Sequence, residues 1–140
     1  MSHHEHEQHT CPTCQQTLPW TKVDVIDVKA AIEADRLTDA DTFKRTYLGH
    51  GTRSSVFVFQ GHAGPFRKHV HTTHDEIGYV LKGTGSVTVG AVTRPVKAGD
   101  IWVIPANTPH GAEFGDPPQV LFISSPIDDP SNQDRVWVDD

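Results

Sequence analysis

Three histidines and a glutamate in the middle of the chain have types and spacings that suit a metal site. His69 and His71 are separated by one residue. On a β-strand, side chains at i and i+2 point to the same face, with their backbones about 6.6 Å apart, so both imidazoles can reach one ion. The pair therefore predicts two ligands on one strand.

Glu76 and His110 join this pair only if the chain turns. In an extended chain Glu76 would lie about 17 Å from His71, too far to share an ion, but the polar residues 72–75 between them favour a bend. His110 follows the proline-rich segment 105–109, which predicts a rigid turn before the next strand. Three imidazoles and a carboxylate suit a divalent transition metal and leave up to two coordination positions open.

The glycines and prolines around these residues complete two motifs. Their order along the chain is Gly64, His69, His71, Glu76 and Gly83, and then Gly99, Pro105, Asn107 and His110. This order resembles the two conserved motifs of the cupin superfamily. Asn107 stands where glycine is more usual, which suits a left-handed turn, and Phe114 replaces a terminal asparagine.

The resemblance covers residues 64–114 and implies a fold, a ligand set and a cofactor. The implied fold is all-β, a single cupin-type antiparallel β-barrel (a double-stranded β-helix or jelly roll). The implied cofactor is one divalent transition metal, with iron preferred over Mn, Ni, Cu or Zn. The implied metal ligands are His69, His71, Glu76 and His110.

Short β-rich segments, spaced about ten residues apart and bounded by turn residues, predict the strands that position this site. They are residues 43–48, 55–60, 66–71, 77–81, 86–89, 101–104, 110–114 and 120–124. A short N-terminal helix is expected from Val28 to Arg36, with Asp27 as its N-cap. The apolar triplet 136–138 is expected to cover an edge of the barrel.

The chain has 140 residues, which suits a single domain, here assigned to residues 20–140. Residues 1–19 form a His/Cys-rich tail in which Cys11 and Cys14 make half of a zinc-type site. The histidines of the tail offer further ligands for this possible tail metal. The favoured interpretation, however, is a solvated tail that binds metal only loosely.

Charge and hydropathy exclude several classes of partner. The net charge of −6, without a basic block, argues against nucleic acid. Apolar runs fall short of the ~20 residues that a membrane span needs, and the N-terminus lacks the pattern of a signal peptide. We therefore expect no membrane partner and a cytoplasmic location.

The family resemblance implies a metal-dependent enzyme that acts on a small oxygenated molecule, with dioxygenase-like chemistry favoured. A non-redox decarboxylase, lyase or isomerase remains an alternative, as does a cupin that binds metal or a small molecule without turnover. Cupins host many reactions, so the fold alone does not choose among these. The resemblance also implies a homodimer.

Substrate contacts are expected from residues near the ligands. Arg67 has the same strand parity as His69 and is expected to look into the barrel, where it or Arg53 is a possible anchor for a carboxylate. Tyr79 and Trp102 are expected to shape the substrate pocket. The other histidines of this region are expected at the surface: His50, His62 and His74.

Overall fold

The structure is a computed structural model that describes residues 8–10, 17–21, 25–127 and 134–138. The first elements are β1 (Gln8–Thr10), β2 (Thr17–Thr21), α1 (Val28–Ala34), β3 (Phe43–His50), β4 (Ser55–Gly61) and β5 (Gly64–Val70). They are followed by β6 (Asp75–Lys82), β7 (Thr84–Val89), β8 (Val92–Lys97), β9 (Ile101–Ile104), β10 (His110–Phe114), β11 (Gln119–Ser125) and β12 (Val136–Trp137). The all-β fold with one short helix is confirmed.

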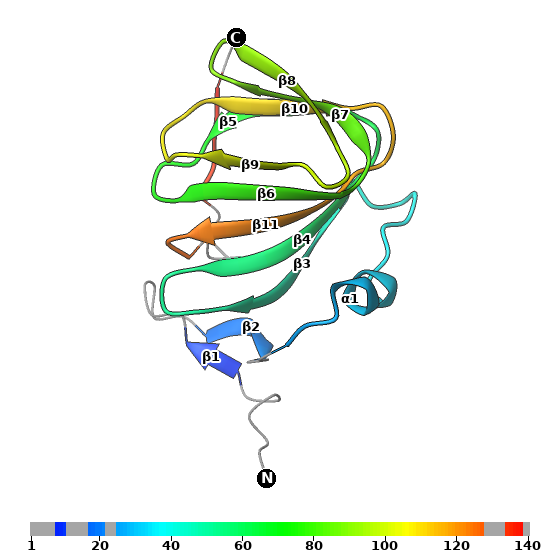
Figure 1. The fold of residues 1–140 in the computed structure, drawn as a ribbon. Helices are drawn as coiled ribbons and strands as arrows, with labels where there is room; N and C mark the ends of the chain where they lie inside the picture. Colours follow the sequence, from blue (N-terminus) through cyan, green and yellow to red (C-terminus); the bar gives the residue numbers. More distant parts are fainter. Residues whose placement is uncertain (1–7, 11–16, 22–24, 128–133, 139–140) are drawn as a thin grey trace.

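Two five-stranded antiparallel sheets face each other across the molecule (Figure 1). One sheet has the strand order β12-β5-β10-β7-β8, and the other has the order β3-β4-β11-β6-β9. Consecutive strands often lie in different sheets, as in a jelly roll. Residues far apart in the sequence therefore meet between the two layers.

Buried apolar side chains form two clusters. The cluster between the sheets consists of Val80, Val87, Val96, Ile104, Phe114 and Val120. The second cluster lies on the outer face of the β3-β4 pair, where Ile32 of α1 packs against Leu48 and Val58. Burying such side chains supplies most of the favourable free energy of folding.

The helix begins where the sequence predicts and ends two residues earlier. The Asp27 carboxylate accepts a hydrogen bond from the Ala30 backbone N–H at 3.0 Å, which confirms the predicted N-cap. The helix gives way to Asp35, whose backbone N–H donates to the Ile32 carbonyl and whose side chain bonds to β3.

Two edge strands show what the sequence patterns predicted and what they missed. Strand β12 pairs with β5 at the edge of its sheet, so the expectation that residues 136–138 cover a barrel edge is confirmed. Strand β8 was not predicted because it contains Pro95. Proline is tolerated there because β8 is an edge strand and pairs only with β7 in its sheet.

In the tail, β1 and β2 pair as a small antiparallel sheet. Cys11 and Cys14 lie outside the described residues, so the possible tail metal and the domain boundary after residue 19 stay predictions.

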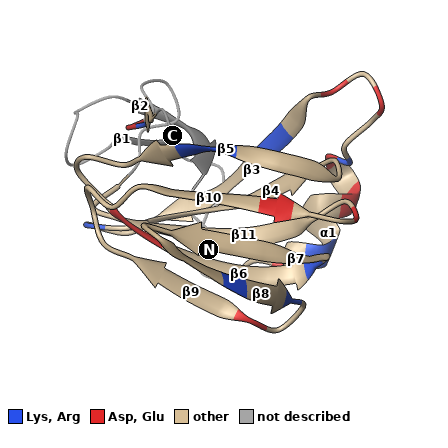
Figure 2. Cartoon of the chain, turned by 90° about the horizontal axis from the view of Figure 1, so that it is seen from above, with Lys and Arg blue, Asp and Glu red and all other residues tan. Residues whose placement is uncertain are grey.

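The one helix of the described ranges is too short to span a lipid bilayer. Charged residues of both signs are spread over the strands and turns (Figure 2).

Candidate metal centre

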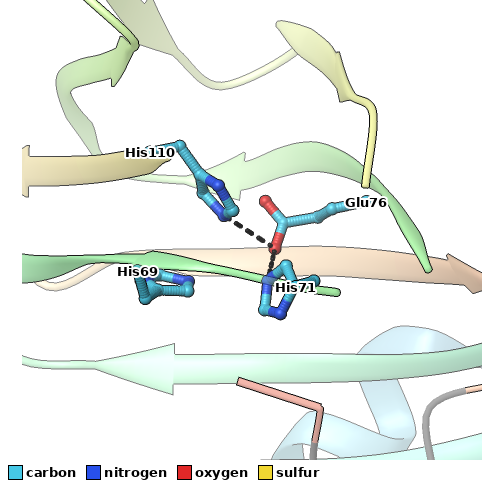
Figure 3. Close-up of side chains that lie close together, drawn as sticks. All are labelled: His69, His71, Glu76 and His110. Atoms are coloured by element: carbon cyan, nitrogen blue, oxygen red, sulfur yellow. Dashed lines mark hydrogen bonds and ion pairs between the residues drawn. The ribbon is translucent and has the colours of Figure 1, made fainter. Parts of the chain in front are cut away.

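Both sheets contribute to the predicted ligand set (Figure 3). His69 lies on β5 and His110 begins β10, and the two residues are direct partners in the register of these neighbouring strands. His71 directly follows β5, and Glu76 enters from β6 in the facing sheet. The centre therefore sits between the layers, with three imidazoles on one side and a carboxylate on the other.

The four side chains converge closely enough to share one ion. One ligand atom from each of His69, His71, Glu76 and His110 lies within 4.8 Å of all the others. The Glu76 Oε1 atom is 3.0 Å from His71 Nε2 and 3.6 Å from His110 Nε2. The side chains are also largely shielded from water, since His71, Glu76 and His110 are each at most 9% exposed.

Backbone carbonyls orient all three imidazoles. The Nδ1 atoms of His69, His71 and His110 lie 2.7, 2.7 and 2.9 Å from the carbonyl oxygens of Arg67, Asp134 and Thr108. A carbonyl oxygen only accepts hydrogen bonds, so each Nδ1 carries a proton and donates it. In its neutral form, each ring then presents the lone pair of Nε2 to the centre, which is the arrangement that metal-binding histidines require.

The polar atoms at the centre fit a bound cation. His110 Nε2 is buried and has no hydrogen-bond partner among the described residues, a costly state that a metal ion would relieve. His71 satisfies both the Asp134 carbonyl and Glu76 only as an imidazolium, since both of its nitrogens must then donate. A cation held between His71 and Glu76 would replace that proton.

The ionisation of the centre also favours metal binding. Burial lowers the pKa of His69 to about 4, so this imidazole is neutral and able to coordinate at neutral pH. Burial alone raises the pKa of the Glu76 carboxyl, but the imidazoles of His110 and His71 outweigh it and hold that pKa well below its usual range. His69 as a neutral imidazole and Glu76 as a carboxylate are thus in the protonation states that bind a metal.

A distant aspartate holds the bend between His71 and Glu76. The Asp134 carboxylate accepts hydrogen bonds from the backbone N–H and side-chain O–H groups of both Thr72 and Thr73, at 2.6 to 2.9 Å. Burial raises the pKa of Asp134, but these donors outweigh it and keep the pKa well below its usual range. The predicted bend is present, and Asp134 fixes its shape.

The same carboxylate corrects the expectation for His74. This residue was expected to face solvent, but it is only 2% exposed. Its Nδ1 lies 3.0 Å from Asp134 Oδ2, and its ring stacks on His71 with centroids 4.4 Å apart. Burial is tolerated because Asp134, sixty residues later in the chain, supplies the polar partner.

The proline-rich turn before His110 is built as its sequence predicts. Asn107 has a φ of 62°, the left-handed conformation that its position in the motif suggests. Its backbone N–H donates to the His71 carbonyl at 2.6 Å, and the Ala106 N–H donates to the Asp75 carboxylate at 2.9 Å. The turn thereby ties the strand of His110 to the bend that carries Glu76.

Trp102 and Tyr79, expected together at the substrate pocket, lie on opposite faces of the sheet. Trp102 faces inward, and its Nε1–H donates to Glu76 Oε2 at 3.0 Å. Gly78 makes this possible, because a Cβ at that residue would lie 2.3 Å from the indole. Tyr79 is one residue on, so it faces outward, is 39% exposed and does not line the cavity described next. The expectation that Tyr79 shapes the pocket is thus corrected, because neighbouring residues on a strand point to opposite faces.

The centre opens into a cavity of about 610 Å³ between the sheets. The cavity is lined by Arg67 and Trp102, as expected, whereas the exposed Arg53 is not among its lining residues. His62 is exposed at its rim, and His50 is half-buried elsewhere. The lining arginines and the four candidate ligands make this cavity the candidate substrate site.

Sequence reasoning missed three residues at the candidate site. Arg45 lines the cavity from β3, where its parity with Phe43 and Tyr47 was the available signal. Asp134 and Trp137 come from the C-terminal segment, which returns to the mouth of the barrel. The apolar triplet 136–138 indicated only that this segment covers an edge of the barrel, because its position at the cavity depends on the pairing between β12 and β5.

Comparison with known proteins identifies the family. The pattern that defines the Cupin domain matches residues 55–124, half of the chain, and this range contains all four candidate ligands. The chain belongs to the cupin family. A curated relative of this cupin, an uncharacterized protein of Methanocaldococcus jannaschii, is 42% identical over 60 residues, which cover 41% of this chain and 48% of the relative. The match thus spans about half of that relative's length.

Solved structures give the same picture. KdgF from Halomonas sp. is 28% identical with a TM-score of 0.60, over 67% of this cupin and 88% of KdgF. An RmlC-like cupin from Shewanella frigidimarina is 26% identical with a TM-score of 0.57, over 64% and 80% of the two chains. A Klebsiella pneumoniae protein with a double-stranded β-helix domain has a TM-score of 0.66 at 20% identity, over 85% and 100%, a likeness in fold alone.

Proposed function

We propose that this cupin is a metal-dependent enzyme that acts on a small oxygenated molecule, with dioxygenase-like chemistry and iron as its preferred ion. The observation that carries the proposal is the convergence of three imidazoles and a carboxylate, within 4.8 Å, at a cavity of about 610 Å³. His69, His71, Glu76 and His110 would hold the ion. A bound metal with open positions polarises substrate oxygens and, when it is iron, supports chemistry with dioxygen.

The residues of the chain itself would then bind the substrate and keep it away from water. Trp102 both lines the cavity and holds the Glu76 carboxylate in place. Carbonyl groups fix the three imidazoles, so the ligand set needs little rearrangement on metal binding. Such preorganisation favours tight over loose binding of the metal.

The metal centre is tested by elemental analysis of the full chain, purified without a His-tag or a chelating column. We expect wild-type protein to contain one metal ion per chain at this centre and His110→Ala to lose it. The matched control is His50→Gln, which changes a histidine outside the cavity and should retain the metal. Undiminished metal in His110→Ala would contradict the proposed ligand set. A Cys11→Ser/Cys14→Ser variant removes the cysteine ligands of the tail.

The type of chemistry is tested by oxygen consumption with candidate diketones, flavonols or thiols. Consumption that requires the metal and disappears in His110→Ala supports the dioxygenase-like proposal. Substrate conversion without oxygen uptake would replace it with a decarboxylase, lyase or isomerase. Metal and ligand binding with no conversion at all would leave a binding protein.

We also propose a homodimer, formed through the outer face of β6 and β9. Tyr79, Ile101 and Val103 are 39%, 62% and 65% exposed there, and all three lie on one face in the register of the two strands. Strand β9 is the last strand of its sheet, so its outer edge is open to pairing in the part of the chain that is described. Light scattering should give twice the chain mass, and Val103→Glu should shift it towards a monomer.

A further inference from the structure

The walls of the cavity have an unusual composition. All six phenylalanines of the chain line it, and so do two of the three tryptophans, Trp102 and Trp137. The six phenylalanines are Phe43, Phe57, Phe59, Phe66, Phe114 and Phe122. Phe114 also belongs to the core cluster between the sheets, and Phe66 and Phe122 pack against that cluster. The aromatic side chains are thus concentrated where a ligand would lie, and they favour a flat, apolar body over a hydroxyl-rich one.

The charged groups of the cavity favour an anion. Arg45, Arg67 and Arg135 line it, whereas the carboxylates among its described lining residues are Glu76 and Asp134. Both carboxylates already accept hydrogen bonds from neighbouring side chains. The chain as a whole carries a net charge of −6, so three arginines in the described lining of one cavity are a local concentration of positive charge in an acidic protein.

Arg45 is placed at one end of a continuous row of aromatic rings. Its guanidinium carbon lies 4.0 Å from the centroid of the Phe57 ring. Phe57 stacks on Phe122 with centroids 5.2 Å apart, and Phe122 meets Trp102 at 6.0 Å. Trp102 in turn donates to Glu76 of the metal centre. This row connects a cation at one end to the metal ligands at the other.

Two further arginines stand near the C-terminal segment. The guanidinium carbons of Arg67 and Arg135 lie 5.0 and 4.5 Å from the centroid of the Trp137 ring. Both arginines are exposed to solvent. They are therefore better placed to attract a ligand from solution than to hold it inside the cavity. Such stacked arginines attract anions and keep their planar faces against an aromatic surface.

We propose that the substrate of this cupin is an aromatic carboxylate, whose ring lies among the aromatic side chains of the cavity and whose carboxylate pairs with Arg45. The other end of the molecule then faces the metal centre. This inference rests on the proposed function for the role of the metal, but the recognition of ring and charge depends on residues outside the ligand set. Arg67 and Arg135 would attract the anion to the cavity.

The test measures binding of three compounds to the full chain by calorimetry: 4-hydroxybenzoate, its neutral analogue 4-hydroxybenzamide, and gluconate, an acid that is hydroxylated and not aromatic. Each is titrated into metal-free and zinc-loaded protein. We expect 4-hydroxybenzoate to bind about tenfold more tightly than either comparison compound, already in the metal-free protein, because a charged pair with an arginine is worth at least that factor. Equal binding of acid and amide, or tighter binding of gluconate, would overturn the proposal.

Variants assign the recognition to Arg45. Arg45→Gln should abolish the preference for the acid over the amide, and Arg45→Lys should retain part of it because the positive charge remains. The matched control Arg53→Gln changes an exposed arginine that does not line the cavity and should leave the preference intact. A preference that survives in folded Arg45→Gln would overturn the role of Arg45. The comparison of compounds in wild-type protein decides the substrate class even if that variant does not fold.

Metal content, measured on the same preparations, separates this inference from the proposed function. A protein that holds its metal but does not distinguish acid from amide contradicts only the substrate class. A protein that prefers the acid but takes up no metal contradicts only the metal centre.

Discussion

The two faces of the β3-β4-β11-β6-β9 sheet differ in what covers them, although the same strands form both. On the outer face, α1 closes over aliphatic side chains such as Leu48 and Val58. On the inner face, Arg45, Phe57 and Trp102 border a cavity. Strand β3 shows the division clearly: Lys44 and Thr46 bond to Asp35 beside the helix, whereas Arg45 lines the cavity. The closed face stabilises the fold, and the open face is available for binding.

Truncating the outer face should give the largest effect, and on stability alone. Leu48 is 7% exposed in the cluster under α1, so Leu48→Ala should lower the free energy of unfolding by about 2–5 kcal/mol. Metal content of the folded protein should stay at the wild-type level. Chemical denaturation and elemental analysis measure the two quantities, and Val92→Ala at a site 49% exposed is the control. Loss of metal from folded Leu48→Ala would show that the two faces are coupled.

Removing the Asp134 carboxylate should act mainly on the inner face. In Asp134→Ala the donors on Thr72, Thr73 and His74 lose their acceptor, and the bend before Glu76 loosens. Groups that hold metal ligands typically contribute 10- to 100-fold to affinity, so we expect zinc affinity to fall by about that factor. Competition with a chelator measures it. Asp100→Ala, which removes a similar acceptor from the turn at Lys97, should leave the affinity unchanged.

Filling the space beneath Trp102 should displace its indole. The Cβ of Gly78→Ala would lie 2.3 to 2.6 Å from three atoms of the ring, so the hydrogen bond to Glu76 must break. We expect a loss of about 1–3 kcal/mol in stability, together with weaker metal binding and a shifted tryptophan fluorescence. In the control, Gly49→Ala, the new Cβ meets only Ile26 at 3.8 Å. Wild-type fluorescence and metal affinity in Gly78→Ala would contradict the proposed role of Trp102.

The smallest effect concerns pH and the outer face. Hydrogen bonds from Lys44 and then Thr46 hold the pKa of Asp35 below its ordinary value of 3.8. The folded state therefore binds this proton less readily than the unfolded state, so the contribution to stability is present above about pH 4 and is lost as the pH falls below it. A partly exposed pair of this kind contributes little to stability, because solvent screens it. Chemical denaturation of Asp35→Asn at several pH values should show a free energy of unfolding that changes less below about pH 4 than in the wild-type protein. An unchanged pH dependence would show that Asp35 does not contribute to it.

Local sequence patterns predict much of the fold and all four candidate ligands. The helix cap at Asp27 and the left-handed Asn107 follow from local backbone chemistry, and both are present. The strands also fall close to their predicted positions, because alternating β-rich segments and turn residues act over a few neighbours. Strand β8 escaped prediction because Pro95 is tolerated only at a sheet edge, and edge position is not a local property.

The sequence by itself determined which residues have the chemistry for a metal centre, because a His-x-His pair and a rigid turn are local features. Only the tertiary structure decided which long-range partners complete the site. It brought Asp134 to the bend at Thr72, buried His74 and turned Tyr79 outward. It also gathered every phenylalanine around the same cavity as Arg45. These outcomes depend on which strands pair and which faces meet, and that choice is made by the packing of the two sheets.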